Sequence, residues 1–216
     1  MAAGHEPELK HHFDDMGQQH EAATLGMWLF LCTEVLFFGG LFAAYLLYRV
    51  WYPETFGDAS RTLDIVLGTA NTMVLITSSL TMAMAVRSAA LGERRALLVF
   101  LVLTMVLGAV FLGVKGVEYH EKFVEHHVPG PGFHFEGTAP ERAQLFFSLY
   151  FAMTGLHALH MVIGLGLLAV MLVMAWRGAF SPRWHTPVEV SGLYWHFVDI
   201  IWIFLFPLLY LVDRHQ

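Results

Sequence analysis

The sequence predicts an all-α protein, an integral membrane bundle of five transmembrane helices. Of its 216 residues, 56% are hydrophobic and only 14% are charged, whereas a soluble domain normally has about a quarter of its residues charged. The mean hydropathy is positive, at +0.56. Five apolar segments are each long enough to cross a bilayer, which takes about 20 apolar residues per helix. We therefore expect lipid, rather than water, to surround most of the chain.

A polar N-terminal tail, residues 1–21, precedes the membrane domain, residues 22–216. The tail is acidic where a secretory signal would be basic and then apolar, so the first span should direct insertion itself. The second span carries small hydroxylated residues that suit close helix packing. The fourth is longer than one crossing requires, which indicates tilt or a projecting end. The predicted spans are about 22–50, 63–87, 96–118, 143–176 and 188–212.

Residues 118–144 form the one sizeable loop, and it is acidic, rich in histidine and turned by PGPG. The histidines suggest a metal site, but we expect a solvated, partly ordered loop.

Basic residues divide evenly between the two sides of the membrane. Arg87 and the GERR turn are the densest basic cluster in a short loop, which favours a cytoplasmic N-terminus. The net charge of −6 argues against a nucleic-acid partner, and no basic cluster is large enough to offset it.

Ionisable side chains lie at membrane depth in four of the five spans. Glu34 lies near the middle of the first span, where a lone carboxylate costs about 2.5–3.5 kcal/mol on insertion scales. Three further pairs have the spacing that places both members on one helical face. They are Lys115 with Glu118, His157 with His160, and His196 with Asp199.

Each of these groups has a structural interpretation. We expect Lys115 and Glu118 to form a snorkelling pair at the membrane interface, and His196 and Asp199 to form a buried, hydrogen-bonded pair. The two remaining histidines could hold a metal, contact lipid or join helices. Glu34, the histidines and Asp199 could in principle converge on a metal ion. Metal sites need three or four ligands in fixed geometry, so we expect no metal site here. A standalone membrane metalloenzyme or ion carrier is the remote functional alternative.

Several long motifs occur in an order that resembles subunit III of the haem–copper terminal oxidases, in particular cytochrome c oxidase subunit III. They extend from about residue 22 to the end of the fifth span. In chain order they read GMWLFLCTEVLFFGGLFAAY, NTMVLITSSLTM with LGERR, GVKGVEYHE, TGLHALHMVIG and YWHFVDIIWIFLFPLLY.

The resemblance implies an accessory subunit without a catalytic or redox centre of its own. Haem and copper would reside in partner subunits I and II, and cytochrome c would supply electrons to the complex, which reduces O2 and pumps protons. This chain would pack on subunit I, bind phospholipid in a cleft and support proton uptake. The complex would lie in a bacterial plasma membrane, with this chain as a multi-pass subunit.

The resemblance also assigns residues. Glu34 corresponds to the family's carbodiimide-reactive membrane glutamate, and His157 and His160 to its lipid-contacting HxxH histidines. Glu118 falls in an EY-x-E motif. The WHFVD-xx-W motif supplies His196, Asp199 and Trp202, the last as a lipid-binding or helix-packing residue. The tail could act as a proton antenna or as a plain docking segment, and its candidate antenna residues are His11, His12, Asp14, Asp15, His20 and Glu21.

One departure from the family pattern concerns the number of spans. Mitochondrial-type members have seven, and this chain begins at what would be their third, so the lipid cleft must be open or completed by another chain. Five spans also occur in quinol oxidase subunit III and in accessory subunits related to nitric oxide reductase. The intact TEVLFF around Glu34 favours a cytochrome c oxidase over these alternatives.

Overall fold

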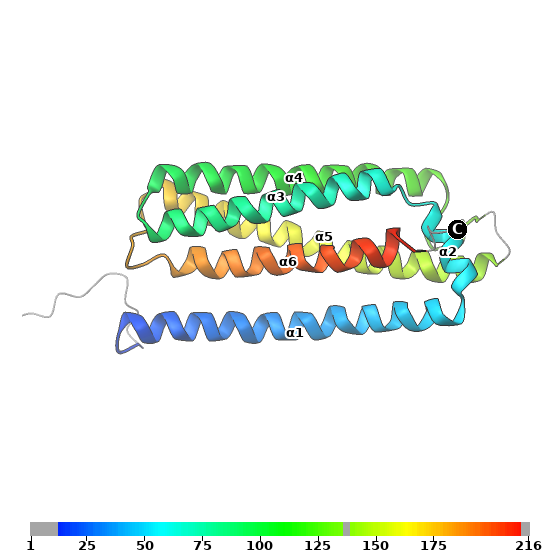
Figure 1. Cartoon of the computed structure of the whole chain (residues 1–216), viewed down its shortest axis with the longest axis horizontal. Coiled ribbons are helices and arrows are strands. Elements are labelled where there is room, and N and C mark those ends of the chain that lie inside the picture. Colours follow the sequence, from blue (N-terminus) through cyan, green and yellow to red (C-terminus); the bar gives the residue numbers. More distant parts are fainter. Residues whose placement is uncertain (1–12, 136–138, 213–216) are drawn as a thin grey trace, which may run out of the picture.

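The computed structural model describes residues 13–135 and 139–212. Six helices account for most of this part of the chain (Figure 1). They are α1 (Met16–Trp51), α2 (Pro53–Arg61), α3 (Ile65–Ala90), α4 (Arg94–Val124), α5 (Pro140–Trp176) and α6 (Thr186–Tyr210). The all-α prediction is confirmed.

Five of these helices are long and apolar enough to cross a membrane, as the sequence predicted. They run side by side along the long axis, and the last turn of α6 lies toward the end of the molecule opposite to the start of α1 (Figure 1). The longest, α5, has 37 residues and so extends about 55 Å, which exceeds the hydrocarbon thickness of a bilayer. The extra length expected for the fourth span is therefore present.

The helix boundaries differ from the prediction where polar residues continue a helix. α1 begins at Met16, inside the predicted tail, because the Asp15 side chain caps it by accepting from the Gln18 backbone N–H at 2.8 Å. α4 continues to Val124, so the first residues of the expected loop are helical. The short helix α2 was not predicted. It begins at Pro53, and proline is favoured in the first helical turn.

α3, α4, α5 and α6 form a four-helix bundle in which each helix packs against two others of the four. α1 packs against α5 and α6 only on one side (Figure 1). Hydroxyl groups of α3 join it to its neighbours, as expected for a closely packed helix. Ser78 donates to the carbonyl of Thr104, and Thr72 accepts from the indole N–H of Trp202 at 3.0 Å.

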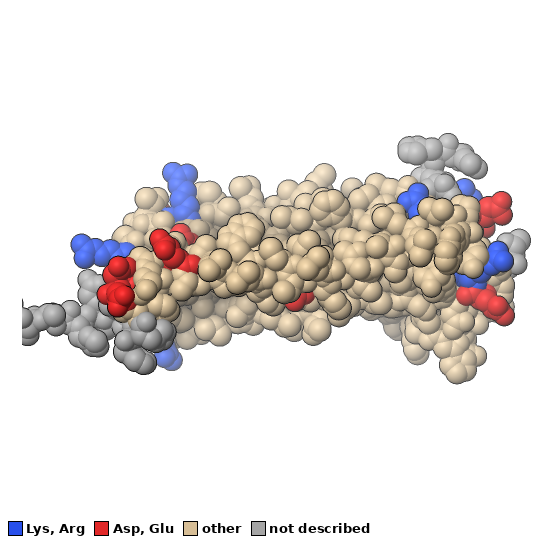
Figure 2. All heavy atoms as spheres, turned by 90° about the horizontal axis from the view of Figure 1, so that it is seen from below, with Lys and Arg blue, Asp and Glu red and all other residues tan. Residues whose placement is uncertain are grey.

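Charged residues gather at the two ends of the molecule, and the long middle band of this face is almost entirely uncharged (Figure 2). Large apolar side chains are exposed on the membrane-spanning helices, among them Leu36 of α1, Val106 of α4 and Val170 of α5. This distribution is that of a protein whose middle is surrounded by lipid.

Candidate functional site

Glu34 on α1 has a partner in His160 on α5. Glu34 Oε2 lies 3.2 Å from His160 Nε2, and the two side chains are only 19% and 12% exposed. The ring edge of Phe38 and the ring of Tyr194 pack beside the imidazole. The mid-membrane carboxyl group is therefore not isolated, and it faces the bundle.

The second ring nitrogen of His160 fixes the protonation pattern of this pair. Nδ1 lies 2.8 Å from the carbonyl oxygen of Leu156, and a carbonyl can only accept, so Nδ1 carries a proton. Nε2 then either accepts the proton of a neutral Glu34 or donates to an ionised one. In both states one proton lies between the two side chains.

His157 lies one helical turn from His160 but in a different environment. It is buried, with its ring between Phe111 at 5.3 Å and Trp202 at 5.2 Å, and neither ring nitrogen has a hydrogen-bond partner among the described residues. Trp202 is buried as well. Of the two alternatives, lipid binding and helix packing, the burial of His157 and Trp202 favours helix packing, because both lie among α4, α5 and α6.

Lys115 and Glu118 are buried inside the bundle, so the prediction of a snorkelling pair is wrong. Lys115 Nζ lies 3.0 Å from Glu118 Oε2, and both residues are at most 3% exposed. Two tyrosines complete the cluster. Tyr150 on α5 donates to Glu118 at 2.6 Å, and Tyr210 on α6 also donates to this carboxylate. The end of the Lys115 side chain lies among aromatic groups, whereas the end of a snorkelling side chain would reach water.

His196 and Asp199 do not form the hydrogen-bonded pair that their spacing predicted. His196 Nδ1 instead lies 2.7 Å from the Ser79 hydroxyl of α3, and neither carboxylate oxygen of Asp199 has a hydrogen-bond partner in the described part of the chain. Both residues line a groove between α3 and α6. An i, i+3 spacing places two residues on one face but does not bring their polar atoms together.

The mid-membrane residues therefore occupy three separate places, and the conceivable convergence on one centre is wrong. Glu34 and His160 lie between α1 and α5, His157 lies in the core, and His196 and Asp199 face α3. In residues 13–135 and 139–212, no three His, Cys, Asp or Glu residues are grouped so that they could hold a metal ion.

The candidate antenna residues are only partly described. His11 and His12 lie outside the described residues, and Asp14, Asp15 and Glu21 are exposed at the start of α1. His20 Nδ1 lies 3.0 Å from the Thr186 hydroxyl and 3.6 Å from Glu189 of α6. His185 also contacts Glu189, at 3.2 Å. Sequence reasoning missed His185 and Glu189, of which Glu189 joins the start of α6 to His20 at the start of α1.

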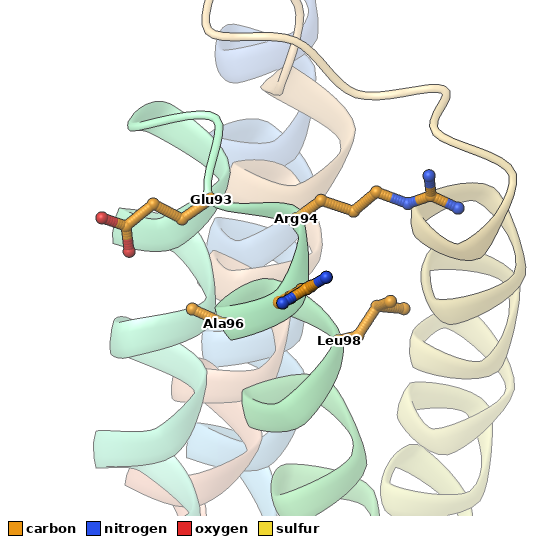
Figure 3. A pocket seen from close by; sticks show the side chains of 5 residues that line it. Glu93, Arg94, Ala96 and Leu98 are labelled. Carbon is orange, nitrogen blue, oxygen red and sulfur yellow. The ribbon is translucent and has the colours of Figure 1, made fainter.

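A wide hollow at the start of α4 carries no comparable arrangement. It has a volume of about 620 Å³ and is lined by residues 93–96 and Leu98. Figure 3 shows Glu93 and Arg94 pointing away from each other. Arg94 donates from Nε to the carbonyl of Ala175 at 2.9 Å and also to that of Trp176. This arginine therefore binds the last turn of α5 and does not point into an open site.

His127 in the loop after α4 gives the chain a pH-sensitive contact outside the membrane. Its ring stacks on Phe147 at 4.8 Å. Burial lowers the pKa of His127 below its usual value of 6.5, as does the nearby Lys122, while Glu125 opposes the shift. The folded chain thus binds fewer protons here than the unfolded chain.

We expect stability to fall as the pH drops below about 6.5, because protonation favours the unfolded state. Thermal unfolding of the purified complex between pH 7.5 and 5.5 measures this. His127→Phe should flatten the dependence, and the exposed control His120→Phe should not. Equal pH dependence of wild type and His127→Phe would contradict the assignment.

Comparison with known proteins provides an independent line of evidence. Residues 10–213 match the family model described as cytochrome c oxidase subunit III. Cytochrome c oxidase subunit 3 of Thermostichus vulcanus is 35% identical over 209 residues, covering 93% of this chain and 92% of the relative. Cytochrome c oxidase subunit 3 of Alkalihalophilus pseudofirmus is 32% identical, with 87% and 85% covered. Cytochrome bo(3) ubiquinol oxidase subunit 3 of Pseudomonas aeruginosa is 30% identical, with 95% and 92% covered.

Proposed function

The chain belongs to the cytochrome c oxidase subunit III family and is an accessory subunit of a terminal oxidase; we propose that its complex takes electrons from cytochrome c in a bacterial plasma membrane. Haem and copper in partner subunits I and II would reduce O2 and drive proton pumping. The observation that carries this proposal is the family match, which includes all five membrane spans.

The contribution of this chain would be to stabilise subunit I, organise lipid and support proton uptake. α1 packs on its neighbours with one side only and exposes large apolar residues such as Val35 and Leu36. Exposed apolar surface at membrane depth suits lipid chains or a partner helix. These properties favour a scaffold that presents surfaces to lipid and partners.

The Glu34–His160 pair supports a role in proton handling. A proton shared between the two side chains would satisfy both of them at membrane depth. Polar residues at the start of α1 and α6 would lie on the cytoplasmic side if the N-terminus is inside, which is the orientation we propose. His20, Glu21 and Glu189 could then hold protons near the uptake side.

Affinity purification of the tagged chain tests the proposal directly. We expect partner subunits with haem and copper absorbance to be recovered, and the preparation to oxidise reduced cytochrome c with consumption of O2. Recovery of the chain without haem, or of stoichiometric metal bound to the chain alone, would contradict the accessory role.

A quinol oxidase is the second candidate, and a specific observation favours it. Subunit 3 proteins of quinol oxidases from Pseudomonas aeruginosa and Bacillus subtilis are each 30% identical to this chain. The co-purified subunit II distinguishes the two donors. A CuA-type Cys/His site and activity with cytochrome c indicate the first candidate, and activity with quinol alone indicates the second.

Substitutions of Glu34 test what the pair with His160 requires. Glu34→Gln keeps a hydrogen-bond donor for Nε2, so we expect assembly close to that of wild type. Glu34→Leu leaves Nε2 without a partner at a poorly hydrated position and should destabilise the chain by about 1–3 kcal/mol. Thermal unfolding of the purified complex measures both. Equal destabilisation by the two variants would mean that the charge of Glu34, and not a hydrogen bond, stabilises the pair.

A further inference from the structure

A groove runs along the outer side of the bundle between α3 and α6. It has a volume of about 380 Å³ and lies beside a second hollow of about 420 Å³, with which it shares Ala83 and His196. The second hollow extends to Glu189 and His20 at the start of α6 and α1. Together they form an elongated depression that follows α6 for about 20 Å, from Glu189 to Ile203.

Asp199 lies in this groove near the middle of α6, about 20 Å from its first residue at 1.5 Å per residue. The residue is 3% exposed, and neither of its carboxylate oxygens has a hydrogen-bond partner among the described residues. The nearby Ser79 hydroxyl bonds to His196 Nδ1. A hydroxyl has only one proton, so even a rotated Ser79 would leave one oxygen of Asp199 without a donor.

An unpaired carboxyl group at this depth restricts what can occupy the groove. Acyl chains have no hydrogen-bond donor, and the hydrocarbon core contains no water to supply one. The side chain of a neighbouring transmembrane helix can supply one, and ionisable residues in spans usually pair in this way. An occupant with a donor at mid-membrane depth therefore fits Asp199, and a lipid tail does not.

The walls of the groove also suit a helix. Ile76 and Leu80 of α3 are four residues apart, Ile200 and Ile203 of α6 are three apart, and all four are about half exposed or more. These spacings form ridges along each helix, between which side chains of another helix can pack. The small Ala83 of α3, which also lines the groove, permits close approach.

We infer that a transmembrane helix of a partner oxidase subunit docks in the α3–α6 groove and places a hydrogen-bond-donating side chain against Asp199. The inference rests on the proposed function, because it takes the partner from the oxidase complex. It adds the face of the chain that makes the contact and the chemistry that the partner must present, which is an Arg, Lys, Tyr, Trp, Ser or Thr side chain at mid-membrane depth.

Photo-cross-linking in native membranes tests the location. A benzophenone amino acid replaces Ile200 in the groove or, as a matched control, the similarly exposed Val106 on α4. After irradiation we expect more adduct with a haem-carrying subunit from position 200 than from position 106. Equal or lower partner adduct from position 200, or lipid adduct alone, would overturn the inference.

Variants of Asp199 test the chemistry. Because Asp199 has no partner within the described chain, Asp199→Leu should leave the amount of chain in the membrane unchanged. It should lower the haem recovered with the chain after detergent extraction by at least about tenfold. Asp199→Asn, which can still accept a hydrogen bond, should retain most of the haem. Wild-type haem recovery with Asp199→Leu, or loss of the chain itself, would overturn the inference.

Different results would contradict the proposed function and the location of the contact in the α3–α6 groove. If the wild-type tagged chain recovers no haem, the proposed function fails. If the wild-type chain recovers haem while the position 200 probe and Asp199→Leu give the overturning results, only the location of the contact is wrong.

Discussion

Replacing Glu118 with Gln should destabilise the protein by about 3–5 kcal/mol, the cost of leaving a buried charge without its partner. Lys115 Nζ has Glu118 Oε2 at 3.0 Å and is otherwise surrounded by aromatic groups. The indole of Trp202 lies 5.1 Å away and the ring of Tyr150 lies 5.2 Å away. With glutamine at position 118, the buried ammonium group would retain a neutral amide oxygen, the phenol oxygens and the ring faces, but no negative charge.

The loss should extend across three helices, because Glu118 of α4 also accepts from Tyr150 of α5 and Tyr210 of α6. The measurement is the thermal unfolding of the purified complex, together with the fraction of this chain that remains bound after detergent washing. Asp58→Asn is a matched control, since Asp58 forms an exposed i, i+3 ion pair with Arg61, and such pairs contribute about 0–1 kcal/mol.

A double substitution separates the effect of an unpaired buried charge on stability from the effect of the lost tyrosine hydrogen bonds. Lys115→Met combined with Glu118→Leu removes both charges and keeps apolar volume, so it should recover much of the stability lost in Glu118→Gln. If Glu118→Gln unfolds at the wild-type temperature, the carboxylate does not stabilise the cluster. If the double variant is no better than Glu118→Gln, the tyrosine hydrogen bonds, rather than the ion pair, account for the loss.

The sequence predicted the membrane helices well because hydropathy reports the solvent of each segment directly. Five apolar runs became five long helices. The prediction missed α2 because its nine residues, PETFGDASR, are polar on average, and nothing local indicates that Phe56 and Ala59 pack into the interior. Burial of a short polar helix depends on the helices beside it.

The candidate site was predictable in its residues but not in its partners. Spacing identified Lys115 with Glu118 and His196 with Asp199 as neighbours on one helical face. Their environment depends on residues far away in the sequence, such as Tyr210 for Glu118 and Ser79 for His196. The same limit applied to Glu34, whose partner His160 is 126 positions away. A single sequence carries no signal for such contacts between helices.

Trp195 should be the most costly apolar residue to truncate, because its indole contacts all three other helices of the bundle. Its Nε1 donates to the Ser78 hydroxyl of α3 at 3.1 Å, and its ring lies against Gly108 of α4 and Gly164 of α5. The residue is fully buried. We expect Trp195→Ala to destabilise the protein by about 3–5 kcal/mol, the usual cost of such a truncation in a core.

The two glycines explain how an indole fits between close helices. A Cβ atom at Gly108 would lie 2.7 Å from Trp195 Cη2, and one at Gly164 would lie 3.0 Å from Cε3 and Cζ3. A rigid ring held by α6 and Ser78 cannot yield by that amount, so Gly108→Val should also destabilise the protein, by about 1–3 kcal/mol or more. Gly113→Val on the same helix is the control, since a Cβ there meets nothing within 4 Å.

Combining the two substitutions tests whether the glycine and the indole act through the same space. In the background of Trp195→Ala the steric conflict at position 108 is removed, and the valine can occupy part of the cavity. We therefore expect Gly108→Val to cost less in this background than alone, with a coupling free energy of about 0.5–3 kcal/mol from thermal unfolding of the four complexes. Additive losses would show that Gly108 is required for another reason, such as close approach of α4 to α5.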